Sequence, residues 1–259
     1  MGATLETRGS SDPALLESPM LVGTLANTAS VIDYANLDAT HRDADVVEVR
    51  LDLIPRDEWD RVFAACDRLE SSGTPVLSTL RLKSDGGEWT GEDADRLPIF
   101  QRAIEHSSWV DVEATSKIAS AVCDAAHKGG KKTLVSSHDF VSTPSGDQLE
   151  QLYTKSLLLG ADIVKVATMT TVREHHTALI NLVARHASEG KICAMGMGSF
   201  GLPLRIYLPV IGSRFAYAFL DRPSAPGQLS CSHMVDLLRL QMPRFNERYL
   251  ARTKSLEAA

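Results

Sequence analysis

The chain has 259 residues, which is long enough for one large α/β domain or for two ordinary domains. Hydrophobic residues make up 44% and charged residues 23%, close to globular averages, which argues against disordered, collagen-like and coiled-coil classes. The formal net charge of -6 argues against general binding to nucleic acid or to anionic membranes, because both rely on clustered Lys and Arg.

Short apolar runs recur about every thirty residues from residue 20 onward, with amphipathic stretches between them, as expected for parallel βα units. Pro98 predicts that the helix after the third run begins or kinks close to it. The eight predicted strands are 20–25, 46–53, 75–81, 109–113, 132–138, 162–168, 191–197 and 214–220. Eight is the number that closes a (β/α)8 barrel, a TIM barrel, so we expect an α/β protein of one domain. A doubly wound open sheet is the alternative, but no GxGxxG follows the first run.

The ends of the chain look different from the barrel. We expect residues 1–18 to form a flexible N-terminal arm, residues 19–250 the catalytic barrel, and residues 251–259 a C-terminal tail. The sequence shows neither a signal peptide nor an apolar stretch long enough to cross a membrane. The four cysteines form no CxxC pair, so we expect free thiols and a cytoplasmic protein.

Polar residues occur two apart within several predicted strands, and residues two apart share one face of a strand. If the flanking valines and leucines face the helices, these side chains point into the barrel. For Asp52, Asp111 and Glu113, structural ion pairs and a functional role are about equally supported. The pattern comprises Glu48, Arg50 and Asp52, then Thr79 and Arg81, then Asp111 and Glu113, then Ser136 and His138.

Lys165 lies in the middle of the apolar run DIVKVAT, where a strand buried on both faces is expected. Burial disfavours the ammonium form, and neighbouring Arg50 and Arg81 add to this effect, so the amine is expected to be nucleophilic. An ion-paired structural lysine is the ordinary alternative. His138 ends the preceding predicted strand, which places an imidazole base close to an imine formed on Lys165.

Six motifs, in order along residues 19–245, resemble those of the type I 3-dehydroquinate dehydratases of the shikimate pathway. They are EVR at 48–50, RLKSDGGE at 81–88, SSHDF at 136–140, DIVKVATM at 162–169, MGMGSFGLPLR at 195–205 and SAPGQ at 224–228. The resemblance implies a lyase that dehydrates 3-dehydroquinate to 3-dehydroshikimate by syn elimination through a lysine imine, with no metal and no organic cofactor. It also implies a homodimer.

The resemblance also implies a role for each matching residue. Lys165 would form the imine, His138 would be the general base, and Asp85 stands where the family has a glutamate that orients the histidine. Arg205 would bind the substrate carboxylate, a task that suits its bidentate fork. The remaining substrate-binding positions would be Glu48, Arg50, Arg81, Ser224, Gln228, Thr24, Phe140, Met197 and Tyr217.

Three positions depart from the family pattern. Asp85 is one methylene shorter than the expected glutamate, so its contact with His138 is expected to be longer, indirect or absent. Gly196 and Leu204 replace serines, which is expected to alter loop packing rather than chemistry.

Two other functions stay open. An aldolase would also need a buried strand lysine, but it has no obvious use for Arg205 together with SAPGQ. A metabolite sensor that has lost turnover would fit the altered Asp85, although such a protein has little reason to retain both His138 and Lys165. The paired His175 and His176 are expected at a solvated helix start rather than at a metal, and DGG at 85–87 is expected to be a turn.

Overall fold

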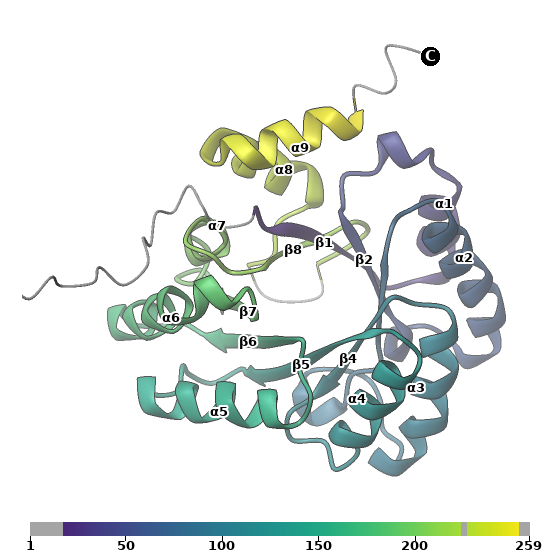
Figure 1. The fold of residues 1–259 in the computed structure, drawn as a ribbon, viewed down its shortest axis with the longest axis horizontal. Helices are drawn as coiled ribbons and strands as arrows, with labels where there is room; N and C mark the ends of the chain where they lie inside the picture. The colour runs from purple at the N-terminus through teal and green to yellow at the C-terminus, as the bar shows by residue number, and fades with distance from the viewer. Residues whose placement is uncertain (1–17, 224–226, 254–259) are drawn as a thin grey trace, which may run out of the picture.

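The computed structural model describes residues 18–223 and 227–253 of the chain. Eight parallel strands form one sheet in the order β7-β6-β5-β4-β3-β2-β1-β8, so β8 returns to lie beside β1 (Figure 1). The strands are β1 Met20–Leu25, β2 Val46–Arg50, β3 Val76–Thr79, β4 Trp109–Glu113, β5 Lys132–Asp139, β6 Ile163–Met169, β7 Ile192–Met197 and β8 Phe215–Phe219. The predicted (β/α)8 barrel is therefore confirmed. The predicted second strand was too long, because Leu51–Leu53 forms a turn of 3-10 helix.

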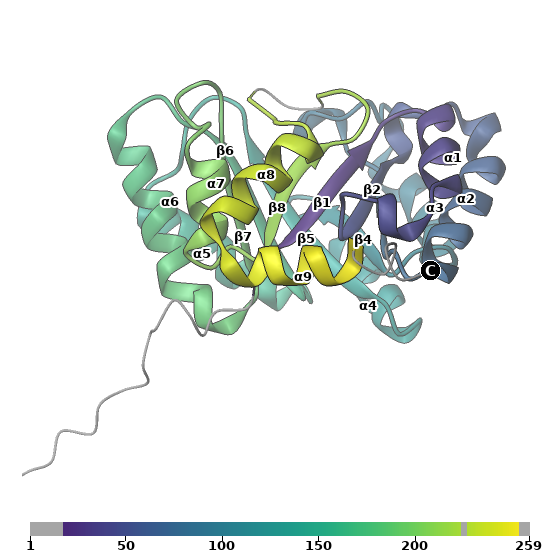
Figure 2. The same ribbon diagram turned by 90° about the horizontal axis from the view of Figure 1, so that it is seen from above.

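Helices cover the outside of the barrel and follow the strands in chain order (Figure 2). They are α1 Thr28–Asn36, α2 Trp59–Ser71, α3 Arg96–Glu105, α4 Ala119–Lys128, α5 Gly146–Leu158, α6 Arg173–His186, α7 Leu204–Val210, α8 Cys231–Gln241 and α9 Pro243–Thr253. Pro98 lies in the first turn of α3, where a missing N–H costs nothing, as the sequence predicted. No helix within the described ranges has the length and apolarity needed to span a bilayer.

The expected N-terminal arm and C-terminal tail fall mostly outside the described residues. Residues 1–17 and 254–259 are not described, whereas residues 251–253 still belong to α9. The boundary of the tail at residue 251 therefore does not coincide with the end of a helix.

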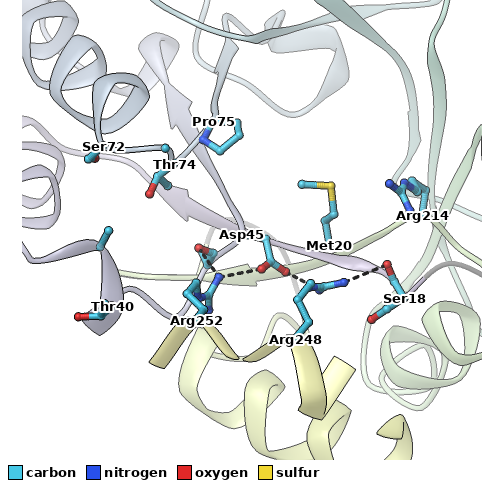
Figure 3. Close-up of a pocket in the computed structure, with 13 residues that line it drawn as sticks. Ser18, Met20, Thr40, Asp45, Ser72, Thr74, Pro75, Arg214, Arg248 and Arg252 are labelled. Carbon is cyan, nitrogen blue, oxygen red and sulfur yellow. Dashed lines mark hydrogen bonds and ion pairs between the residues drawn. The ribbon is translucent and has the colours of Figure 1, made fainter. Parts of the chain in front are cut away.

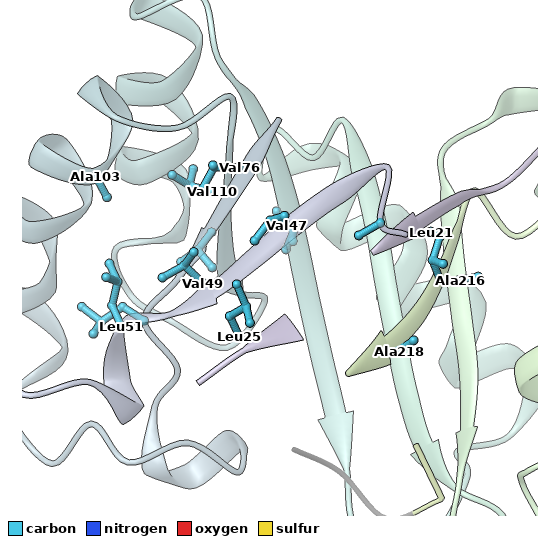
Figure 4. Packing of buried hydrophobic residues seen from close by; sticks show 14 of the residues in the cluster. Leu21, Leu25, Val47, Val49, Leu51, Val76, Ala103, Val110, Ala216 and Ala218 are labelled. Atoms are coloured by element: carbon cyan, nitrogen blue, oxygen red, sulfur yellow. The ribbon is translucent and has the colours of Figure 1, made fainter. Parts of the chain in front are cut away.

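Alternate residues of each strand face the helices and the barrel interior. Leu21, Val47, Val49 and Ala216 face outward and pack with residues of the helices in one continuous core (Figure 4). All four are 2% exposed or less, so these strands are buried on both faces, as is usual for parallel sheets.

The interior changes character along the strands. Close to where the strands begin, the inward positions are apolar and include Val46, Leu77, Leu134 and Phe215. Two residues further along, the inward positions carry polar groups, for example Glu48 after Val46. Ionisable side chains therefore gather toward the carboxyl ends of the strands, where active sites of this fold are built.

The sheet closes less completely between β7 and β8 than elsewhere. These two strands form no ladder within the described residues, whereas every sequential pair from β1 to β7 does, and β1 also pairs with β8. One backbone bond from Arg214 N to Ile192 O, of 2.7 Å, and one bond from Ala194 N to the Ser213 hydroxyl, of 3.1 Å, bridge the gap. The barrel is thus closed at this point by a few single hydrogen bonds rather than by a regular ladder.

A buried ion pair ties α3 to the barrel. The Arg96 side chain is fully buried and donates to Glu113 Oε2 and to the Leu80 carbonyl oxygen, both at 2.7 Å. It also pairs with Asp93 at 2.6 Å. Glu113 accepts a further bond from Leu82 N at 2.9 Å, so its role is structural, one of the two alternatives that the sequence left open.

Replacing Arg96 by Met should destabilise the protein by about 3–5 kcal/mol, because Glu113 would keep a buried charge after losing its main partner. Urea unfolding followed by circular dichroism measures this free energy. The matched control is Arg102→Met, which removes an exposed ion pair with Asp60 and should cost less than about 1 kcal/mol. Equal losses of unfolding free energy in the two variants would show that the buried Arg96–Glu113 pair stabilises the protein no more than an exposed ion pair does.

Candidate active site

Polar side chains from all parts of the sheet converge in a cavity of about 50 Å³ at the carboxyl ends of the strands. Most of the residues predicted from the sequence line it. They are Thr24, Glu48, Arg50, Arg81, Asp85, His138, Phe140, Lys165, Met197, Arg205, Tyr217 and Gln228, joined by Gly86, Ala167 and Met195. The prediction for Ser224 lies outside the described residues.

Lys165 points into the barrel from the middle of β6 and is 5% exposed. Its Nζ lies 3.2 Å from Asp111 Oδ2 and 3.7 Å from Glu48 Oε1. The ring of Tyr217 lies on another side, with its centroid 4.3 Å from Nζ. The amine is therefore buried as expected, but carboxylates surround it as well as the apolar residues and arginines that the sequence suggested.

Asp111 is the centre of the charged group and is fully buried. It accepts bonds from Arg81 Nη2 at 2.6 Å, from the Ser136 hydroxyl at 2.6 Å and from Lys165 at 3.2 Å. Burial opposes ionisation, but the charges of Arg81 and Lys165 outweigh it and lower the pKa of Asp111. A permanent negative charge therefore lies beside the lysine nitrogen.

The sequence left Asp111 open between structural and functional roles and did not place it in the site. Its spacing of two residues from Glu113 indicated that the side chain points into the barrel. The contact with Lys165 could not be predicted in the same way, because it joins β4 to β6 across an intervening strand. Met195 and Ala167 were also missed, although each lies two residues from a predicted site position and so faces the same way.

Glu48 links three strands on the other side of Lys165. Its Oε2 accepts a bond from the Thr24 hydroxyl at 2.8 Å, and its Oε1 accepts one from the Thr79 hydroxyl at 3.0 Å. Both threonines are 0% exposed. The bonds fix the carboxylate in one orientation, with Oε1 toward the lysine nitrogen.

The Arg50 side chain is paired with Asp52, to which it donates two hydrogen bonds of 2.9 and 2.7 Å. Asp52 also accepts a bond from Glu88 N at 3.1 Å. Arg50 still lines the cavity, so Asp52 acts as the residue that holds it there.

His138 lies at the carboxyl end of β5 with its side chain 10% exposed. Its partner in the ladder is Ala167, which is two residues beyond Lys165 on β6. Burial, together with the nearby charge of Arg81, lowers the pKa of His138 from 6.5 to about 3. The imidazole is therefore neutral at physiological pH and able to accept a proton.

Asp85 approaches His138 but does not reach it. The distance from Asp85 Oδ1 to His138 Nδ1 is 3.9 Å, beyond hydrogen-bonding range, and Nδ1 has no hydrogen-bond partner among the described residues. Burial favours the protonated acid, but the proximity of His138 and Arg81 outweighs it and lowers the pKa of Asp85. The structure thus contains the longer contact with His138 that was expected because Asp85 is one methylene shorter than glutamate.

The turn at 85–87 brings Asp85 to this position. Lys83–Asp85 forms one turn of 3-10 helix that ends at Gly86, whose φ of +78° favours glycine. A Cβ at Gly86 would lie 2.3 Å from the ring of Phe140, and one at Gly87 would lie 2.2 Å from the Arg81 carbonyl oxygen. The two glycines therefore let the turn press against the site, as predicted for a turn.

Phe140 and Arg205 both line the cavity. The ring of Phe140 stacks on His138 with centroids 6.2 Å apart, and the residue is 41% exposed. Arg205 lies in the first turn of α7 and is 3% exposed. Burial lowers the pKa of Arg205 to about 10, which leaves it cationic at neutral pH and suited to an anionic group.

Two departures from the family pattern have structural reasons. A Cβ at Gly196 would lie 2.7 Å from the Thr170 hydroxyl and 2.9 Å from Gly201 Cα, so a serine cannot fit without moving the loop after β7. Leu204 is 2% exposed and packs in the hydrophobic core beneath α7. Both changes therefore concern packing, as expected.

The histidine pair at the start of α6 is occupied by local contacts. His175 Nδ1 accepts a bond from Thr171 N at 3.2 Å, and His176 Nε2 contacts the Phe200 carbonyl oxygen at 2.8 Å. Across residues 18–223 and 227–253, no group of three or more His, Cys, Asp or Glu side chains is placed to hold a metal ion. The ionisable groups that line the site are an amine, an imidazole, carboxylates and guanidinium groups.

Comparison with known proteins agrees with this arrangement. The family model described as Type I 3-dehydroquinase matches residues 25–243. A 3-dehydroquinate dehydratase of Thermodesulfovibrio yellowstonii is 33% identical over 198 residues, covering 76% of this chain and 85% of that protein. Another, of Methanocella arvoryzae, is 32% identical over 197 residues, covering 76% and 87%.

Solved structures support the same fold. The 3-dehydroquinate dehydratase of Geobacillus kaustophilus HTA426 has a TM-score of 0.76 to this chain at 24% identity, covering 86% of this chain and 90% of that one. The family match spans residues 25–243, a range that contains Lys165, His138 and Arg205. The chain therefore belongs to the type I 3-dehydroquinase family.

Proposed function

We propose that this protein dehydrates 3-dehydroquinate to 3-dehydroshikimate, with Lys165 as the imine-forming residue and His138 as the general base. The observation that carries the assignment is the pairing of an inward, buried lysine with a neutral, 10% exposed imidazole one strand away. No aldolase role is needed to explain the site, because Arg205 adds a buried cation that suits a substrate carboxylate.

The reaction follows from these groups. The Lys165 amine adds to the C3 ketone and loses water to give a positively charged imine, which acidifies the neighbouring C2–H bond. His138 takes the C2 proton and then delivers a proton to the C1 hydroxyl, which leaves as water. Hydrolysis of the imine restores the Lys165 amine and releases the enone.

Asp111 and Glu48 supply the electrostatic part of the mechanism. Their carboxylate oxygens lie 3.2 and 3.7 Å from the lysine nitrogen, where the positive charge of the imine develops. Oriented negative groups in a buried site stabilise such a charge without having to reorganise. In this proposal Arg81, held by Asp111, and Arg50, held by Asp52, bind the ring hydroxyls.

The substrate requires movement at the mouth of the cavity. A volume of about 50 Å³ is far below the range of about 300–1,000 Å³ typical of ligand sites. The half-exposed Phe140 ring and Gln228 both border the cavity. We infer that they shift to admit the ring and then shield the imine from water.

Location and assembly extend the proposal. Four buried free cysteines suit a reducing cytoplasm. We also propose a homodimer, as the resemblance to the family implies.

Borohydride reduction should trap the substrate on Lys165. Mass spectrometry of the enzyme mixed with 3-dehydroquinate and borohydride should show an adduct on the peptide that contains residue 165. Lys165→Ala should lose both adduct and turnover, whereas His138→Ala should keep the adduct and lose turnover by about 10²–10⁴-fold. An adduct without enone formation in the unmodified protein would instead favour a metabolite sensor.

His138 should remain neutral well into the acid range. Its folded pKa of about 3 lies below the ordinary 6.5, so the unfolded chain binds this proton first and stability falls as pH drops from about 6.5 toward 3. Between pH 7 and pH 5, wild type should lose about 2 kcal/mol more stability than His138→Gln. Imidazole ¹⁵N shifts report the ring directly, and a midpoint near 6.5 would contradict the proposal.

Asp85→Glu should give equal or higher turnover. One extra methylene lets the carboxylate close the 3.9 Å gap to His138 Nδ1 and orient the base. The same bond should raise the pKa of His138, which NMR titration would detect. A large fall in kcat at unchanged stability would instead mean that the site is refitted around the shorter acid.

A further inference from the structure

Cavities lie at both ends of the barrel. At the end where the strands begin, polar groups that line the cavity hold α9 in place, because Asp45 accepts bonds from Arg252 at 2.7 Å and from Arg248 at 2.8 Å (Figure 3). At the carboxyl ends of the strands, one polar group has no such use. Tyr217 lines the candidate active site, and its hydroxyl has no hydrogen-bond partner among the described residues.

This hydroxyl is buried as well as unpaired. Tyr217 projects inward from the middle of β8 and is 6% exposed. A buried tyrosine hydroxyl usually finds a partner, because a polar group that is buried without a hydrogen bond costs free energy. A ring that served only as an apolar wall of the cavity would need no hydroxyl. The unpaired group therefore calls for an explanation in terms of a bound molecule.

The other hydroxyl groups close to the lysine are already engaged. Ser136 donates to Asp111 at 2.6 Å. Thr24, the other hydroxyl-bearing residue among the described lining residues, donates to Glu48 at 2.8 Å. The hydroxyl that is left for a substrate is thus the one on Tyr217.

The ring of Tyr217 lies against the reacting amine, with its centroid 4.3 Å from Lys165 Nζ. When an amine adds to a ketone, the nitrogen and the ketone oxygen become bonded to the same carbon, so a group beside the nitrogen is also close to that oxygen. Burial and the negative charge of Glu48 raise the pKa of Tyr217 well above its ordinary value of 10. The phenol therefore keeps its proton and can donate a hydrogen bond.

We propose that Tyr217 is a catalytic residue whose hydroxyl donates a hydrogen bond to the ketone oxygen of the substrate while Lys165 attacks. The inference rests on the proposed function and adds a role in its first chemical step. The nitrogen lone pair forms the C–N bond, and the π electrons of the carbonyl move onto the oxygen, where a fixed donor stabilises the developing negative charge. The nitrogen then loses a proton and the oxygen gains one, which gives the hydroxyl that leaves as water. Tyr217 ends this step protonated, as it began.

Tyr217→Phe tests the hydroxyl alone, because the variant keeps a ring beside Lys165. Enzyme mixed with 3-dehydroquinate is quenched with borohydride at successive times, and mass spectrometry measures the fraction reduced onto Lys165. Imine formation should slow about 10²-fold in Tyr217→Phe, the effect expected when one donor to a developing oxyanion is removed. With substrate deuterated at C2, the isotope effect on turnover should fall toward 1 in this variant, because imine formation then limits the rate.

Ser156→Ala is the matched control. Ser156 is 1% exposed on α5, and its hydroxyl also lacks a partner within the described ranges, but it does not line the cavity. This variant should form the imine at the wild-type rate, and equal slowing in both variants would overturn the proposal. Thermal unfolding checks each fold, and neither variant should unfold at a lower temperature than wild type, because each loses a buried hydroxyl that has no partner.

Two outcomes separate this inference from the proposed function. Wild type that neither traps the substrate nor releases enone would contradict the proposed function itself. Wild type that does both, with Tyr217→Phe trapping the substrate equally fast, would overturn only the role of Tyr217. If Tyr217→Phe does not fold, 3-fluorotyrosine at position 217 takes its place. Its phenol is a stronger donor and should speed imine formation, and an unchanged or slower rate would overturn the proposal.

Discussion

The buried carboxylate of Asp111 is the interaction on which the rest of the site depends. Charged groups inside a barrel are stable only when each has an opposite charge and satisfied hydrogen bonds. Asp111 provides this for Arg81 and Lys165 at once, while Ser136 uses its second oxygen. Three strands therefore hold one another's polar groups in place, and the lysine nitrogen has a fixed position before any substrate arrives.

Pairing of buried charges also links the barrel to the surrounding helices. Glu113 binds Arg96 of α3 and lies 3.4 Å from Arg81, so a helix on the outside is joined through charged groups to the site inside. This chain of contacts explains why the strands carry so many ionisable residues. In the proposed mechanism, some of them act on the substrate, and the others fix the orientation of those that do.

Much of the fold and of the candidate site followed from the sequence because both rest on short-range patterns. The thirty-residue recurrence of apolar runs gave the barrel, and the spacing of two gave the inward direction of Glu48 and His138. The apolar run around Lys165 gave the burial of that residue. What the sequence could not give was pairing between strands that are not neighbours, as between Asp111 and Lys165. The polar sequence around Arg96 also gave no sign that this side chain is wholly buried. Likewise, the sequence around Gly196 did not show that the close approach of Gly201 leaves no room for a side chain there.

The seam between β7 and β8 has a consequence for how the chain folds. Strand β8 is joined to β1, at the other end of the chain, by a regular ladder, but to its predecessor by little more than one backbone bond. Closure of the ring therefore awaits the encounter that is most distant along the polypeptide, which is entropically the slowest kind to form.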